Sequence, residues 1–83
     1  KLKFSFKEQR EYDTIDDEIA DLEEQIRLTE TEITASVSDY VKLQELSDRK
    51  EELEVLLAEK MERWVYLNDL AERIEAQKNG QEG

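Results

Sequence analysis

Apolar residues in the first half of the chain recur at alternating intervals of three and four positions. The seven positions are Tyr12, Ile15, Ile19, Leu22, Ile26, Thr29 and Ile33. All of them except Thr29 are apolar, and heptad spacing of this kind gives an α-helix one continuous apolar stripe. Such a stripe is stable only when another helix covers it. The spacing therefore predicts a helix over residues 6–34 that packs against a second helix.

The second half of the chain carries a matching stripe in a different phase. Its members are Leu43, Leu46, Leu53, Leu57, Trp64, Leu67, Ala71 and Ile74. If the first stripe continued without a break, it would place Ser47, Lys50 and Glu54 at seam positions, which disfavours one long dimerising helix. We therefore predict an all-α fold, an antiparallel two-helix coiled-coil hairpin. Its turn lies near residues 35–38, and its second helix covers residues 39–77.

Local signals place the ends of the two helices. Ser5 stands three residues before Glu8, the capping-box pattern that starts a helix near residue 6. The second helix is capped by Ser36 or Ser38, because serine is a preferred N-cap residue. Residues 78–83, which include both glycines of the chain, are expected to be a helix stop and a disordered tail.

The register follows from the position of the turn. Partner residues should have numbers that add to about 76, so that Leu22 meets Leu53 and Tyr12 meets Trp64. Two seam positions of the second helix hold Lys50 and Lys60. We expect both lysines to lay their stems on the seam with their ammonium groups in water, although a lysine at such a position can also set the register.

The second helix is longer than the first, so its far end needs another cover. We expect residues 1–5 to fold back across this end of the hairpin and to bring Phe4 or Phe6 near Trp64. The predicted cluster consists of Phe4, Phe6, Tyr12, Trp64, Tyr66 and Leu67. It is a small core that closes the hairpin. The basic residues around it are Lys1, Lys3, Lys7, Arg10, Arg63 and Arg73. They are either a solvated rim or part of a nucleic-acid platform, since such platforms combine cations with aromatic rings.

Charge is distributed unevenly. The 83 residues carry a net charge of −11, which as a whole repels nucleic acid and anionic membranes. Residues 13–59 hold 16 acidic and 4 basic residues, whereas residues 1–12 hold 4 basic and 2 acidic residues. Any contact with nucleic acid must therefore be made by the end of the hairpin that carries the termini.

The residue types present argue against an enzyme. The sequence has no Cys and no His, which excludes disulfides, cysteine nucleophiles and histidine bases. The many carboxylates of the first helix fit a solvated helix face, because acid–base pairs and metal sites need a pocket that a two-helix stripe does not offer. We expect no catalytic residue, no metal and no cofactor in this chain.

Other expectations concern the setting of the chain. No apolar run reaches the length of a membrane span, and no signal peptide is visible, so we expect a cytoplasmic protein that does not contact membranes. The chain begins at Lys1 and is expected to be a piece of a longer protein. We expect the isolated chain to be a monomer. The alternative is a dimer of hairpins, in which exposed Leu28 and Leu56 would extend the apolar stripe.

Two stretches carry more than periodicity. One runs from Lys1 to Tyr12 and combines Lys-Leu, an aromatic residue and Gln-Arg-Glu; the other runs from Glu62 to Leu70 and contains Arg-Trp-Val-Tyr-Leu. Together they resemble the C-terminal domain of Uup-type ABC-F ATPases, a family whose terminal domain opens and closes with such motifs. The resemblance covers the whole chain in layout and is specific at the two ends. The residues that match the motifs are Lys7, Gln9, Arg10, Arg63, Trp64 and Tyr66.

The resemblance implies a parent protein with two ATP-binding cassettes. ATP and Mg would bind to those cassettes, because this chain has no phosphate-binding Gly-rich loop. Proteins of this family act on translating ribosomes, and their terminal coiled coil is associated with DNA binding and with support of the ATPase. The function implied is a noncatalytic domain that contacts DNA or ribosomal RNA. The alternative is a structural or protein-docking arm whose partner is the parent's own ATPase domains.

Overall fold

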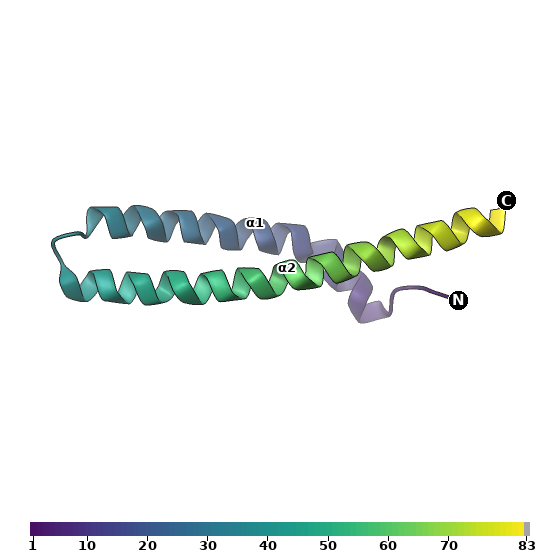
Figure 1. Ribbon diagram of the computed structural model, residues 1–83, viewed down its shortest axis with the longest axis horizontal. Helices are drawn as coiled ribbons and strands as arrows, with labels where there is room; N and C mark the ends of the chain where they lie inside the picture. Colours follow the sequence, from purple (N-terminus) through teal and green to yellow (C-terminus); the bar gives the residue numbers. More distant parts are fainter. Residues whose placement is uncertain (83) are drawn as a thin grey trace.

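The computed structural model describes residues 1–82, with side chains for residues 1–80. It contains helix α1, Phe6–Ala35, and helix α2, Tyr40–Glu82, which lie antiparallel and form a hairpin (Figure 1). The molecule measures 65 × 17 × 15 Å, so it is a rod without a globular core. The predicted all-α, two-helix hairpin is confirmed.

The capping box predicted from Ser5 and Glu8 starts α1. The backbone N–H of Glu8 donates to Ser5 Oγ at 3.1 Å, and the backbone N–H of Ser5 donates to Glu8 Oε1 at 3.0 Å. Both bonds satisfy N–H groups that the first turn of a helix leaves without a partner. The helix therefore begins at Phe6, which fixes the faces on which all later residues of α1 lie.

The turn between the helices is held by Ser36 and Asp39. The N–H of Ser36 donates to the carbonyl of Ile33 at 3.1 Å, and the N–H of Asp39 donates to the carbonyl of Ser36 at 3.0 Å. Asp39 Oδ1 then accepts from the N–H of Lys42 at 3.1 Å, so Asp39 is the N-cap of α2. The expectation that Ser36 or Ser38 caps this helix is wrong, because Asp39 supplies the capping oxygen and Ser36 is the C-cap residue of α1.

The predicted seam is the contact surface between the helices. All seven seam residues of α1 are buried or half-buried, with Ile15 only 1% exposed, and Leu46, Leu53 and Leu67 are buried on α2. Contacts between the helices join Gln25 to Arg49, Glu11 to Arg63 and Glu18 to Lys60, which fits the register expected from the position of the turn. The register follows because a slip along the seam would expose the apolar stripes.

Two polar residues of the seam, Thr29 and Lys60, have partners. Thr29 is 4% exposed, and its hydroxyl donates to the carbonyl of Gln25 at 2.8 Å, within its own helix. Lys50 and Lys60 are half-buried, and the ammonium group of Lys60 forms an ion pair with Glu18 of α1. The two-helix seam is shallow enough for the Lys60 stem to lie on it while the charge reaches a carboxylate at the surface.

Helix α2 continues to Glu82, so the expected helix stop near residue 77 is wrong. Gly80 lies inside the helix and does not adopt a positive φ. A glycine in a helix costs about 1 kcal/mol relative to alanine but does not end the helix by itself, and no proline follows. The last residue of the expected tail, Gly83, lies outside the described residues.

Candidate nucleic-acid interface at the base of the hairpin

The end of the hairpin opposite the turn carries both termini (Figure 1). We call residues 1–18 and 60–80 the base and residues 19–59 the arm. The N-terminal segment is attached to α2 by two bonds to one side chain: the N–H of Leu2 donates to Gln77 Oε1 at 2.9 Å, and Gln77 Nε2 donates to the carbonyl of Leu2 at 3.0 Å. Residues 1–5 therefore lie along the part of α2 that extends beyond the start of α1.

Half of the predicted aromatic cluster forms a core. The ring of Phe4 lies 5.0 Å from the ring of Tyr12, centroid to centroid, with the planes inclined by 31°. Leu67 is fully buried at the same end of the molecule, and Ile15 is almost fully buried. Burial of these side chains supplies the apolar contribution that holds the base together.

The other half of the predicted cluster stays at the surface. Phe6 is 81% exposed, and Trp64 and Tyr66 are 38% and 46% exposed. The placement of Phe6 in the core is wrong for a geometric reason. Phe4 belongs to the extended segment, whereas Phe6 is the first residue of α1, so the two rings do not face the same way.

Trp64 and Tyr66 use their polar atoms to tie α2 to α1. Trp64 Nε1 donates to Asp16 Oδ1 at 2.7 Å, and the Tyr66 hydroxyl donates to Glu8 Oε2 at 2.7 Å. The bond to Glu8 raises the pKa of Tyr66, since losing the proton would break it. The pKa of Glu8 is lowered, first by the backbone bond from Ser5 and then by the bond from Tyr66.

Arg63 is held between an acid and an aromatic ring. Its Nε and Nη2 donate to the two carboxylate oxygens of Glu11 at 2.8 and 2.7 Å, and its guanidinium carbon lies 4.7 Å from the ring centroid of Tyr66. The bidentate bond lowers the pKa of Glu11. Because Glu11 neutralises it, Arg63 is a tie between the helices and not a free cation for a ligand.

These ties were not predicted, although the sequence held a signal for them. Glu8, Glu11 and Glu18 flank the seam of α1 at positions that face Tyr66, Arg63 and Lys60 in the expected register. Flanking residues of opposite charge are typical of paired helices in coiled coils. Comparing them across the register would have identified the ion pairs.

The six predicted contact cations are not equivalent. Arg73 forms an ion pair with Asp69 one turn earlier in α2, at 3.1 Å, and Arg63 is paired with Glu11. Lys1, Lys3, Lys7 and Arg10 are all exposed, and within residues 1–80 none of these four forms an ion pair. Of the six predicted contact cations, the unpaired ones therefore lie on the N-terminal segment and the first turns of α1.

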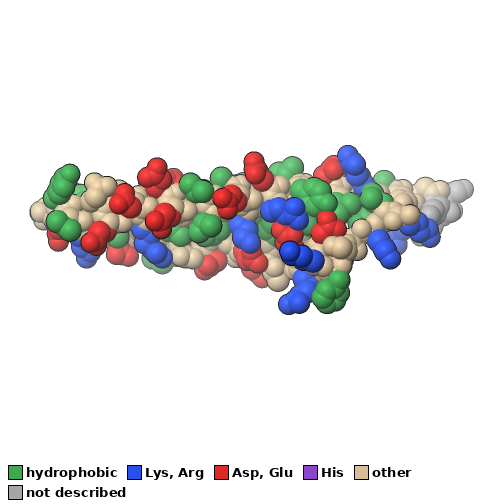
Figure 2. Space-filling view, turned by 90° about the horizontal axis from the view of Figure 1, so that it is seen from below, with side chains coloured by type: hydrophobic (Ala, Val, Ile, Leu, Met, Phe, Trp, Pro, Cys, Tyr) green, Lys and Arg blue, Asp and Glu red, His purple; other side chains and the backbone are tan. Residues whose placement is uncertain are grey.

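Arg10 lies against the exposed aromatic residue that precedes it by one turn. Its guanidinium carbon is 5.8 Å from the centroid of the Phe6 ring, within cation–π range. The space-filling view shows acidic side chains spread along the arm, and basic and hydrophobic side chains projecting together from the base (Figure 2). The base is thus the face of the molecule on which an anionic ligand would meet the least repulsion.

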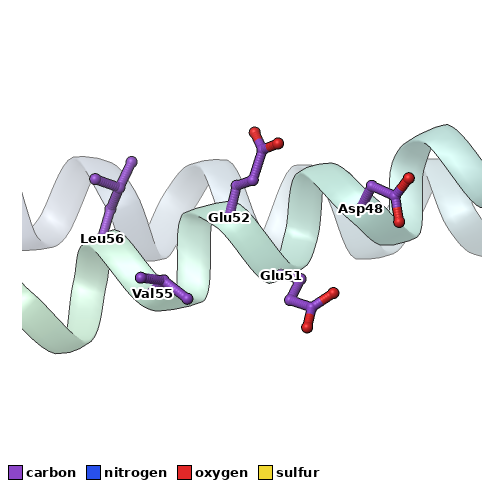
Figure 3. Close-up of a pocket in the computed structure, with 5 residues that line it drawn as sticks. All are labelled: Asp48, Glu51, Glu52, Val55 and Leu56. Carbon is purple, nitrogen blue, oxygen red and sulfur yellow. The ribbon is translucent and has the colours of Figure 1, made fainter.

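Two shallow hollows mark the surface. One, of about 450 Å³, is lined by Lys7, Glu8, Glu11, Lys60 and Arg63 and overlies the ion pairs of the base. The other, of about 660 Å³, lies on the arm, and its five lining residues all come from α2 (Figure 3): Asp48, Glu51, Glu52, Val55 and Leu56.

Neither hollow is a candidate metal site. Within the described residues no cluster of three His, Cys, Asp or Glu side chains could hold a metal ion. Neither helix, over the same residues, combines the length and the apolar character needed to cross a membrane. The chemistry that the base offers is non-covalent: exposed cations beside an exposed aromatic ring.

The fold and the base define a helical-hairpin domain. Residues 3–69 match the family described as the ABC transporter C-terminal domain, and the chain belongs to that family. This confirms the prediction of a C-terminal domain of an ABC ATPase, and ATP and Mg²⁺ belong to the ATP-binding part of such proteins.

A relative in Bacillus subtilis (strain 168) agrees with this assignment. The protein named "Uncharacterized ABC transporter ATP-binding protein YfmR" is 39% identical over 74 residues, which is 89% of this chain. The chain spans 12% of the length of that relative. No solved structure matches the chain.

Proposed function

We propose that this domain belongs to a Uup-type ABC-F ATPase of the cytoplasm and contacts nucleic acid through the base. The family assignment supports an ABC ATP-binding parent, and the two end motifs support the Uup-type subgroup. The observation that carries the nucleic-acid contact is the set of free cations Lys1, Lys3, Lys7 and Arg10 at one end of an otherwise acidic rod.

The distribution of charge also orients the ligand. A phosphate backbone approaching the arm meets mostly carboxylates, whereas at the base it meets four exposed cations that form no ion pair within residues 1–80. Arg63 and Arg73 contribute little to this contact, because Glu11 and Asp69 already pair with them. The partner is DNA or ribosomal RNA, and the domain supports the parent ATPase by holding this partner.

Salt dependence of binding tests the proposal. Each phosphate contact should contribute about 0.9 to the slope of log affinity against log salt for duplex DNA, so replacing Lys3, Lys7 and Arg10 by Gln should reduce the slope by about 2 to 3. Fluorescence anisotropy of this 83-residue chain with labelled duplex DNA and with a ribosomal RNA fragment gives both slopes.

The matched control replaces Lys42, Arg49 and Lys50 of the arm by Gln and removes the same charge. It should lower affinity only through net charge and leave the slope nearly unchanged. Absence of binding to either nucleic acid at low salt, or an equal slope change in the control, would contradict a contact at the base.

A second candidate function is a docking arm, and one surface favours it. Val55 and Leu56 are 54% and 48% exposed on the outer side of α2, beside the carboxylates of Asp48, Glu51 and Glu52 (Figure 3). Charge complementarity makes a basic segment of the parent's own ATPase domains the occupant of this surface. A second copy of the hairpin is a poor occupant because each copy carries a charge of −11. We therefore expect a monomer in isolation.

The two functions are separated by measuring the parent protein. Replacing Val55 and Leu56 by Ser should change ATP turnover and leave nucleic-acid affinity unchanged if the arm docks on the ATPase domains. Val65→Ser, at a position 60% exposed elsewhere on α2, is the control. Unchanged turnover in the double variant would rule out docking through this surface.

A further inference from the structure

Phe6 is an exposed aromatic residue that lies outside the core of the base. It is 81% exposed, whereas Phe4, two residues earlier, packs on Tyr12. The first turn of a helix accepts almost any polar residue, and exposing a large apolar side chain gains no stability. A ring held in water at this point is better suited to meeting something outside the molecule.

The ring is also held in a defined setting. Arg10, one turn along α1, places its guanidinium carbon 5.8 Å from the ring centroid, and this guanidinium forms no ion pair within the described residues. The helix start is rigid, because the capping box of Ser5 and Glu8 fixes it and Glu8 is bonded in turn to Tyr66. Phe6 and Arg10 are therefore an exposed pair of planar groups, with the exposed Lys3 and Lys7 close to them in the sequence.

Planar groups among cations fit one kind of nucleic-acid feature. Base–aromatic stacking is worth about 1–3 kcal/mol per base and requires the free face of a base. In a duplex the faces of bases are covered by their neighbours, whereas single strands, loops and bulges leave them open. Lys3 and Lys7 would contact phosphates beside a base stacked on Phe6.

We propose that Phe6 and Arg10 form a stacking site for an unpaired nucleobase, so that the base of the hairpin prefers single-stranded or looped nucleic acid to duplex. This inference rests on the proposed nucleic-acid contact and adds to it the structural class of the ligand. Neighbouring residues then have different roles. Lys3 and Lys7 bind any phosphate backbone, and Phe6 distinguishes unpaired nucleotides from duplex.

Two oligonucleotides and three variants test it. The affinity of this 83-residue chain is measured for a single strand of about 20 nucleotides and for its duplex, at several salt concentrations. Phe6→Ala should weaken single-strand binding about tenfold, leave duplex binding unchanged and leave the salt slope unchanged. Phe6→Trp should retain single-strand affinity, because an indole stacks at least as well.

The control is Tyr40→Ala. Tyr40 is also 81% exposed but lies next to the turn, at the opposite end of the rod, so its removal should change neither affinity. Because Phe6 and Tyr40 are both exposed, each variant is expected to keep the far-ultraviolet circular dichroism of the unsubstituted chain.

The outcomes separate the two proposals. If the chain binds neither oligonucleotide at low salt, the proposed nucleic-acid contact fails and the stacking site fails with it. If the chain binds both and Phe6→Ala changes the two affinities equally or not at all, the contact stands and the stacking site is wrong. Loss of single-strand affinity in Tyr40→Ala as well would also overturn the assignment to Phe6.

Discussion

The arm and the base of the hairpin share one heptad seam but are held together in different ways. Along the arm the helices meet through aliphatic seam residues, and the polar contact between them is a 3.4 Å bond from Arg49 to Gln25. At the base, Arg63 binds Glu11, Trp64 binds Asp16, and further ties come from Lys60, Tyr66 and Gln77.

Charge explains part of the difference, because two of the ties at the base are ion pairs. The arm holds 12 acidic and 4 basic residues, so few opposite charges are available for ties across the seam. The base holds 10 acidic and 8 basic residues, and its helices can pair. Apolar burial is indifferent to the sign of the flanking charges, and for that reason it can hold the acidic arm.

The largest expected effect tests whether apolar burial dominates in both regions. Leu67→Ala at the base removes a fully buried side chain and should lower the free energy of unfolding by about 3 kcal/mol. Leu46→Ala in the arm, where the side chain is 9% exposed, should cost about 2 kcal/mol. Urea denaturation followed by circular dichroism measures both. Leu56→Ala, 48% exposed, is the control and should stay within about 0.5 kcal/mol of the parent chain.

The cap of α1 should give the next largest effect. Ser5→Ala removes the acceptor for the N–H of Glu8 and should cost about 1 kcal/mol, or a shift of about 4–8 °C in Tm. Ser5→Asn should be close to neutral, because asparagine caps as well as serine. Equal melting temperatures for the alanine and asparagine variants would show that the capping box does not contribute to the stability of the hairpin.

The ion pair of Arg63 and Glu11 should contribute less. A double-mutant cycle with Arg63→Gln and Glu11→Gln should give a coupling energy of about 0.5–1 kcal/mol, since the pair is bidentate but the Arg63 side chain is 46% exposed. The coupling should fall as salt is added. A coupling energy larger than the effect of Leu67→Ala would mean that ion pairing, and not apolar burial, dominates at the base.

The smallest effect concerns pH. Hydrogen bonds at the base lower the folded-state pKa of Glu8, Glu11 and Glu18 below the ordinary value of 4.5. The stability that these bonds provide is present above pH 4.5 and is lost as pH falls through the folded-state pKa values. Carboxyl carbon NMR should place the midpoint of Glu11 below 4.5, and Arg63→Gln should move it back toward 4.5. A Glu11 midpoint at 4.5 in the unsubstituted chain would mean that the ion pair of Arg63 and Glu11 is not formed in solution.

The parts of the fold that could be predicted are those that periodicity determines. Seven apolar or β-branched positions at heptad spacing define a buried face, and the change of phase near Leu43 favours a turn. The register followed from these two facts, and the Ser5 cap followed from a local pattern. None of this depends on the conformations of individual long side chains.

The parts that could not be predicted depend on a single residue or on flexible side chains. Whether Phe4 or Phe6 enters the core is decided by the residue at which α1 begins, because the extended segment and the helix direct side chains differently. Arg63 is paired with Glu11 and has a structural role, unlike the unpaired cations near the N-terminus. This distinction could be made only from the positions of the side chains. The helix end at Glu82 was missed because glycine weakens a helix without stopping it.

The 65 Å length of the hairpin has a mechanical consequence. Both termini lie at one extremity, so a slight tilt imposed there would produce a large displacement of Val37, Tyr40 and Val41 at the opposite extremity, where each is more than two-thirds exposed. Displacement grows with distance from the end that carries the termini, so a rotation about that end moves these three side chains farthest.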